Sequence, residues 1–103
     1  MSERLAKLEQ MLERSPTDPF LLYGIALEHK KAGDSARAIE FLDRTLAADA
    51  GYCYAYFQKG QVQETLGQTT EAKATYRAGV DAARKAGDAH AQSEIEGALS
   101  MLE

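Results

Sequence analysis

The fold is decided by two consecutive stretches of 34 residues, PFLLYGIALEHKKAGDSARAIEFLDRTLAADAGY (residues 19–52) and CYAYFQKGQVQETLGQTTEAKATYRAGVDAARKA (residues 53–86). When the first stretch is aligned with the second, Gly33 falls on Gly67 and Ala38 falls on Ala72. The same alignment pairs similar residues: Phe20 with Tyr54, Leu22 with Tyr56, Tyr23 with Phe57, Ala26 with Gly60, Leu42 with Tyr76 and Leu46 with Val80. A repeat of this length is typical of folds that stack one small structural unit on the next.

Apolar residues within each stretch recur at the spacing of a helix. In the first stretch they are Leu22, Ile25 and Ala26, followed by Ile39, Leu42 and Leu46. This spacing of three and four residues favours helices over strands. A glycine followed by an aspartate, at Gly33-Asp34 and again at Gly87-Asp88, is typical of one helix ending and the next beginning. We therefore expect antiparallel helices near residues 3–14, 18–32, 35–48, 52–66, 69–85 and 89–102.

The flanking segments read as single helices that cap the array. Moved forward by 34 residues, Leu5, Leu8 and Leu12 fall on the apolar positions of the predicted helix at 35–48. The last segment carries an apolar face made of Ala91, Ile95, Ala98, Leu99 and Leu102. Stacked repeats need such caps because each repeat buries its apolar face only against a neighbour. The sequence predicts one domain over residues 1–103, divided into an N-terminal half-repeat (1–17), a first repeat (18–52), a second repeat (53–86) and a C-terminal capping helix (87–103).

The repeat resembles the tetratricopeptide repeat, whose pattern is W-x2-L-G-x2-Y, then A-x3-F, then P. The first repeat offers Leu22-x2-Ile25-Ala26-x2-His29 and Ala38-x3-Leu42, and the second offers Tyr56-x2-Lys59-Gly60-x2-Gln63 and Ala72-x3-Tyr76. Ala50 and Arg84 stand where the family has proline, and Lys59, His29 and Gln63 also depart from the pattern. The resemblance implies an all-α fold of antiparallel helix-turn-helix repeats, wound into a right-handed superhelical solenoid.

Composition narrows the classes of function. The 103 residues include 12 Lys and Arg against 16 Asp and Glu, a net charge of −4, and the last sixteen residues hold no Lys or Arg. Nucleic acid is not an expected partner, because its affinity comes largely from basic side chains. The longest uncharged apolar run, residues 20–27, is far shorter than the roughly 20 residues of a membrane span, so no membrane association is expected. A single cysteine, Cys53, fits a reducing compartment and predicts a cytoplasmic protein.

No catalytic, metal or cofactor motif stands out. Glycine-rich phosphate loops, the nucleophile elbow G-x-S-x-G and the zinc motif H-E-x-x-H are all missing from the sequence. We interpret His29 as a packing histidine, His90 as the i, i+4 partner of Glu94, and Cys53 as a small buried hydrophobe. The prediction is a non-enzymatic protein without a metal or cofactor.

The aromatic residues carry the functional prediction. The run Tyr52-Cys53-Tyr54-Ala55-Tyr56-Phe57 divides by helix geometry, with Tyr56 assigned to the core and Tyr54 and Phe57 to another face. In tetratricopeptide repeats the first helix of each pair lines a concave groove that holds peptides. The resemblance implies that Phe20, Tyr23, Leu27, Lys30, Tyr54, Phe57, Gln61 and Glu64 line such a groove here.

We therefore expect a protein-interaction module that binds an apolar protein or peptide segment, with Lys30 favouring an acidic residue of that segment. The alternative is self-association, in which the aromatic patch or an exposed end of the array packs against a second copy as a homodimer. A third possibility is that the capping helices fold over the patch and make it part of the core.

Overall fold

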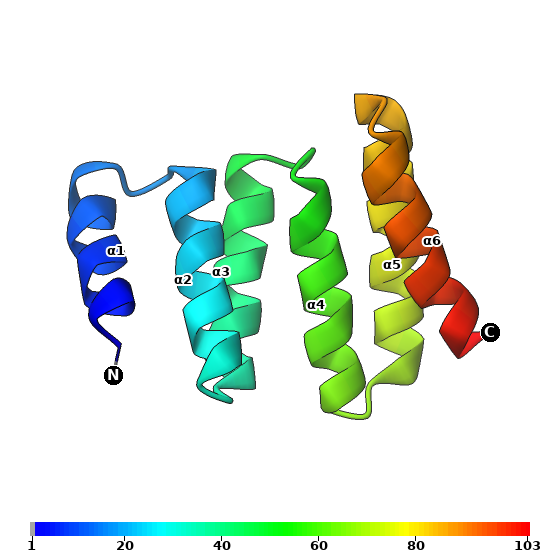
Figure 1. The fold of residues 1–103 in the computed structure, drawn as a ribbon, viewed down its shortest axis with the longest axis horizontal. Coiled ribbons are helices and arrows are strands. Elements are labelled where there is room, and N and C mark those ends of the chain that lie inside the picture. Colours follow the sequence, from blue (N-terminus) through cyan, green and yellow to red (C-terminus); the bar gives the residue numbers. More distant parts are fainter. Residues whose placement is uncertain (1) are drawn as a thin grey trace.

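The computed structural model describes residues 2–103, and within that range the chain forms six α-helices and no β-strand. They are α1 (Glu3–Arg14), α2 (Pro19–Lys31), α3 (Ser35–Ala48), α4 (Cys53–Thr65), α5 (Thr69–Ala86) and α6 (Ala89–Leu102). Figure 1 shows them as an antiparallel array in chain order, with the two termini at opposite ends. The all-α fold class is confirmed, and the helix bounds agree with the predicted ranges to within one residue at each end.

Side-chain caps and glycines explain where the helices begin and end. The carboxylates of Asp18, Asp34 and Asp88 each accept a hydrogen bond from a backbone N–H of the first turn of α2, α3 or α6. At the other ends, Gly33 and Gly67 adopt φ of +80° and +75° in the turns after α2 and α4. Left-handed backbone of this kind is cheap only for glycine, so these residues stop the helices.

Two core clusters follow one another along the array. The first joins α1, α2 and α3 and consists of Leu5, Leu8, Leu21, Leu22, Ile25, Ala26, Phe41 and Leu42, with Ala55 of α4. The second joins α4, α5 and α6 and consists of Cys53, Ala72, Tyr76, Val80, Ala83, Ala91 and Ile95. The small residues of the repeat pattern, Ala26, Ala38 and Ala72, are fully buried, as close approach of paired helices requires.

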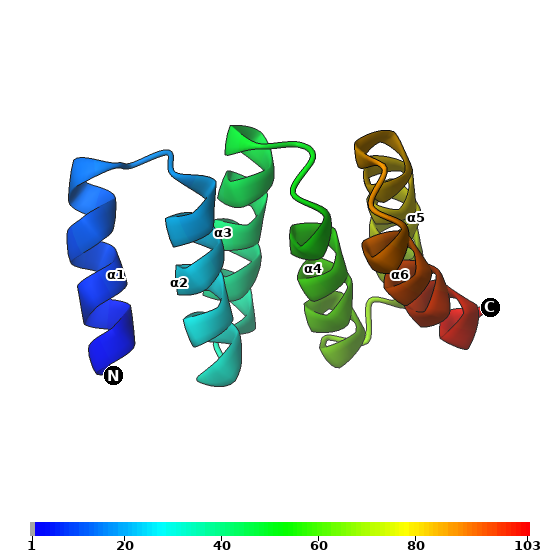
Figure 2. The same cartoon turned by 45° about the horizontal axis from the view of Figure 1, so that its top comes forward.

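The terminal helices cap the array as the sequence predicts. Among the six helices, α1 packs against α2 alone, and α6 packs mainly against α5 with a smaller contact to α4. Figure 2 shows α1 standing at one end of the row and α6 crossing α5 at the other. Each terminal helix therefore covers the apolar face of a single neighbouring repeat.

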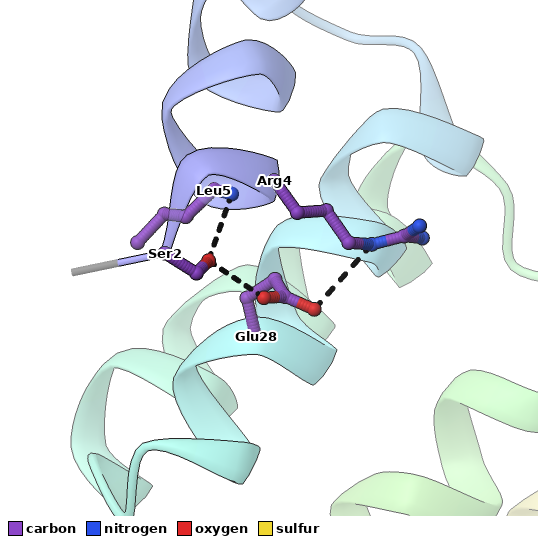
Figure 3. A network of polar contacts seen from close by, with 4 residues as sticks. All are labelled: Ser2, Arg4, Leu5 and Glu28. Atoms are coloured by element: carbon purple, nitrogen blue, oxygen red, sulfur yellow. Dashed lines mark hydrogen bonds and ion pairs between the residues drawn. The ribbon is translucent and has the colours of Figure 1, made fainter.

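A polar network ties the start of α1 to α2. The Glu28 side chain is only 10% exposed, and its two oxygens meet Ser2 Oγ at 2.8 Å and Arg4 Nε at 3.4 Å. Ser2 Oγ also accepts a hydrogen bond from the backbone N–H of Leu5, as Figure 3 shows. The same serine thus caps α1 and bonds it to its only neighbour.

The structure corrects one core assignment and explains the three departures from the repeat pattern. Tyr56 is not a fully buried core residue: it is half-buried, and its hydroxyl donates to the carbonyl of Ala50 at 2.9 Å. The ammonium of Lys59 on α4 forms an ion pair with Asp43 of α3 at 2.7 Å. Its charge is therefore paired between the two helices.

The other departures are both buried polar side chains. His29 is 9% exposed and its ring lies 5.5 Å from the ring of Phe41, which confirms a packing role. Gln63 accepts a hydrogen bond from Thr75 Oγ1 at 2.6 Å, which joins α4 to α5.

Candidate functional site

The eight residues predicted to line a groove lie on two helices of the array that contact each other. α2 carries Phe20, Tyr23, Leu27 and Lys30, and α4 carries Tyr54, Phe57, Gln61 and Glu64. We call the surface that these residues occupy the α2–α4 face. In Figure 1 α2 lies in front of α3, and α6 lies in front of α5.

Lys30 joins the two helices across this face. Its ammonium donates to Gln58 Oε1 at 2.5 Å and to Gln61 Oε1 at 2.7 Å. Within residues 2–103 it forms no ion pair with a carboxylate. Burial lowers the pKa of Lys30. The face therefore holds a partly desolvated positive charge that is oriented by two amides and not neutralised by an acid.

Three of the four aromatic side chains of the face, Tyr23, Tyr54 and Phe57, are half-buried. Tyr23 packs against Tyr52 with ring centroids 4.9 Å apart and the rings tilted by 39°, and Tyr54 meets Phe57 edge to face at 6.4 Å. Such geometries suit the quadrupoles of aromatic rings and fix their positions. Phe20 differs from these, because it is 66% exposed at the first turn of α2. Leu27 is partly buried one turn beyond Tyr23.

The second core cluster takes up part of the predicted surface. Phe57 lies 6.3 Å from the ring of the buried Tyr76 and packs against the cluster together with Leu99 and Leu102 of α6. The Tyr54 hydroxyl donates to Glu94 Oε1 of α6 at 2.9 Å, and this hydrogen bond raises the pKa of Tyr54 to about 12. Thus α6 packs beside α4 and covers part of the α2–α4 face.

Glu64 is directed toward α5. Its Oε2 accepts a short hydrogen bond from the hydroxyl of Tyr76, a side chain that is itself fully buried. Burial, and then this hydrogen bond to Glu64, raises the pKa of Tyr76. The structure therefore brings Lys30 together with Gln61 and Tyr54 with Phe57, whereas the Glu64 carboxylate is already engaged by the fold.

Sequence reasoning missed two residues of this surface. Gln58 lies three residues before Gln61, so the i, i+3 spacing on α4 gave a signal that it shares the same face. Tyr52 precedes the first turn of α4, where helical periodicity carries no information, and only the structure shows that it packs against Tyr23.

Comparison with known proteins identifies the repeat. Residues 54–85 match the family model described as tetratricopeptide repeat. A tetratricopeptide repeat domain protein from Salinibacter ruber, whose solution structure is known, is 33% identical, with a TM-score of 0.80 over 85% of this chain and 89% of that chain. The chain belongs to the tetratricopeptide repeat family.

Two further likenesses extend over almost the whole chain. A TPR repeat-containing protein of Pseudomonas aeruginosa is 28% identical over 96 residues, which are 93% of this chain and 91% of that protein. The solution structure of a protein from Bordetella parapertussis shares the fold at 22% identity, with a TM-score of 0.85 over 99% of this chain and 89% of that chain. Tetratricopeptide repeats are generally non-enzymatic modules for protein–protein interaction.

The other residues singled out from the sequence are Cys53 and His90. Cys53 is 7% exposed, burial raises the pKa of its thiol, and its Sγ lies 3.3 Å from the carbonyl oxygen of Gly51. His90 pairs with Glu94 at 2.6 Å, as predicted from their spacing. Over residues 2–103 no three His, Cys, Asp or Glu side chains gather closely enough to hold a metal ion. None of the helices in this range has the length and apolar character needed to cross a bilayer.

Proposed function

We propose that this chain is a non-enzymatic interaction module that binds a protein or peptide segment on the α2–α4 face. The observation that carries the proposal is the ammonium of Lys30, which Gln58 and Gln61 orient and which no carboxylate within residues 2–103 neutralises. A half-buried cation of this kind attracts an acidic side chain or chain terminus of a partner. The exposed ring of Phe20 and the half-buried rings of Tyr23 and Tyr54 supply apolar contact on the same face.

The proposed partner is an apolar segment that carries an acidic residue near Lys30. It does not include nucleic acid or a membrane, since the net charge of −4 opposes polyanions. The single buried thiol of Cys53 supports the cytoplasm as the compartment in which the chain works.

The test selects linear peptides from a display library on the purified chain and maps a selected peptide by amide chemical shifts. We expect shifts clustered on α2 and α4. Replacing Phe20→Ala should weaken the affinity by about 1–3 kcal/mol, the usual contribution of an aromatic anchor. Lys30→Gln should weaken the affinity for peptides that carry an acidic residue and leave the others unchanged.

Met11→Ala is the matched control, because Met11 is 54% exposed on α1, outside the α2–α4 face. Selected peptides whose shifts map elsewhere, or whose affinity falls equally in the control and in Phe20→Ala, would contradict the assignment of the binding surface.

Self-association is a second candidate, because apolar side chains stand exposed on both terminal helices. Met11 of α1 is 54% exposed, and Met101 of α6 is 85% exposed. An end-to-end contact between copies would cover both residues. Light scattering at increasing protein concentration, repeated with Met101→Ser, decides between a monomer and such an assembly.

A further inference from the structure

One end of the α2–α4 face borders a shallow, open surface cavity of about 420 Å³. Residues of the α3–α4 and α5–α6 connections line it, and both connections lie at the upper edge of Figure 1. Its lining consists of Tyr23, Tyr52 and Tyr54 with Asp49, Asp88 and small neighbours. No Lys, Arg or His side chain contributes to it. The cavity therefore combines aromatic rings with negative charges and has no positive side chain in its lining.

The carboxylates near this cavity each make only one hydrogen bond within the fold. Asp49 Oδ1 accepts from the backbone N–H of Gly51 at 2.9 Å, and Asp88 Oδ1 accepts from that of Ala91 at 3.0 Å. Asp18, which caps the adjoining start of α2, likewise uses only Oδ1. Within residues 2–103 none of these three aspartates forms an ion pair. Each thus keeps one carboxylate oxygen for a partner.

Helix dipoles do not cancel this negative charge. Three helices, α2, α4 and α6, begin at the same edge of the array, which is the upper edge in Figure 1. Each N-terminus is equivalent to about half a positive charge, but α1, α3 and α5 end at the same edge and each C-terminus is equivalent to about half a negative charge, so the helix dipoles nearly cancel one another. The remaining field reaches the rings: burial, and then the charges of Asp49 and Asp18, raises the pKa of Tyr52.

Aromatic rings add a second attraction for a cation. The rings of Tyr23 and Tyr52 lie with their centroids 4.9 Å apart. A Lys or Arg head group within about 6 Å of a tyrosine ring gains from the ring quadrupole, and the aliphatic stem gains apolar contact. Carboxylates around tyrosine rings are thus complementary to a basic side chain, which uses both groups at once.

We propose that this cavity receives a Lys or Arg side chain of the segment that binds the α2–α4 face. The inference rests on the proposed function and adds an opposite charge preference at the other end of the same surface. Tyr23 and Lys30 are seven residues apart on α2, or about 10 Å at 1.5 Å per residue. An extended segment covers that distance in about three residues. The partner therefore carries a basic and an acidic residue about three positions apart.

The experiment uses peptides selected on the intact chain from a display library. We expect basic residues to be enriched three positions from acidic ones. The chain with Asp49→Asn and Asp88→Asn should bind such a peptide at least fivefold more weakly, and the loss should shrink at high salt. Asparagine keeps the capping oxygen, so the variant retains its helix ends.

Asp34→Asn is the matched control. Asp34 caps the start of α3 through the backbone N–H of Arg37, at the edge of the array opposite to the starts of α2, α4 and α6. It should leave the affinity unchanged. Norleucine in place of the peptide's basic residue should lower the affinity for the native chain as much as the two Asn substitutions do. Its affinity should then no longer depend on Asp49 and Asp88.

Four outcomes would overturn the inference. Peptides that bind the α2–α4 face without a basic residue, or whose affinity ignores the Asn substitutions, contradict it and leave the proposed function standing. Saturation of the cavity by arginine amide alone, with no competition against the selected peptides, assigns it to a free small cation instead. If no peptide shifts the amides of α2 and α4, the proposed function and this inference fall together.

Discussion

At the scale of single residues, Gly60 shows most directly how the repeat pattern works. A Cβ atom added at this position would lie 2.6 Å from Tyr76 Cζ and 2.7 Å from Tyr76 Cδ1. The ring has no room to move, because Tyr76 is fully buried and its hydroxyl is bonded to Glu64. We expect Gly60→Ala to lower the free energy of unfolding by about 1–3 kcal/mol, although alanine favours helices, and urea denaturation measures this change.

Gly97→Ala provides the control for that substitution. Nothing lies within 4 Å of a Cβ built on Gly97, which is also inside a helix. Only the higher helix propensity of alanine acts there, so the free energy of unfolding of this variant should rise by about 0.5–1 kcal/mol. If both alanines stabilised the chain, the close approach of α4 and α5 at Gly60 would be wrong.

Tyr54 reports the contact between α4 and α6 through its titration. The hydrogen bond to Glu94 raises its pKa from 10.0 to about 12. Because the folded-state value is the higher one, the stability from this bond is complete below pH 10 and is lost as the pH rises toward 12. Glu94→Gln should bring the phenol back toward its ordinary value in an ultraviolet titration, with Tyr54→Phe identifying the signal. An unchanged titration in Glu94→Gln would exclude the bond.

At the scale of helices, the paired helices of the second repeat meet at a buried alanine. Ala72 is fully buried on α5, whereas Ala74 is exposed on the same helix. Leucine at Ala72 forces α4 and α5 apart, so we expect a loss of about 1–3 kcal/mol in the free energy of unfolding. Ala74→Leu should change it by less than about 0.5 kcal/mol. Equal midpoints in urea for the two variants would contradict the assigned helix contact.

The helices were predictable from sequence because their determinants are local. Aspartate caps begin α2, α3 and α6, positive-φ glycines follow α2, α4 and α5, and the 34-residue register transfers one repeat to the other. The resemblance to the tetratricopeptide repeat also placed Lys30 and Gln61 on one surface. The register failed at Tyr56, whose hydroxyl bonds to the α3–α4 connection, and it gave no sign that the Glu64 carboxylate accepts from Tyr76 of α5. Periodicity describes which side of a helix a residue occupies, but not the neighbour that competes for its polar atoms.

At the scale of the whole molecule, stability in a stacked array depends on the number of neighbours that each helix has. The four central helices each pack against helices on both sides, whereas α1 contacts α2 alone. Repeat proteins behave as a sum of units and nearest-neighbour interfaces, so openings begin at the ends. We therefore expect α1 to exchange its amide hydrogens faster than α2 to α5.

The contact of Glu28 with Ser2 and Arg4 is the polar part of that single interface, since the carboxylate is nearly buried between the two helices. Glu28→Gln removes the charge that Arg4 faces, and a loss of about 1 kcal/mol raises the opening of α1 roughly fivefold. Hydrogen exchange of α1 should accelerate by that factor while the amides of α4 and α5 keep their rates, because no contact links them to α1. Glu13→Gln, an exposed charge of α1 without an ion pair within residues 2–103, should leave every rate unchanged. Equal acceleration across all six helices would instead mean that the array unfolds as one cooperative unit, and that the two core clusters act as a single core.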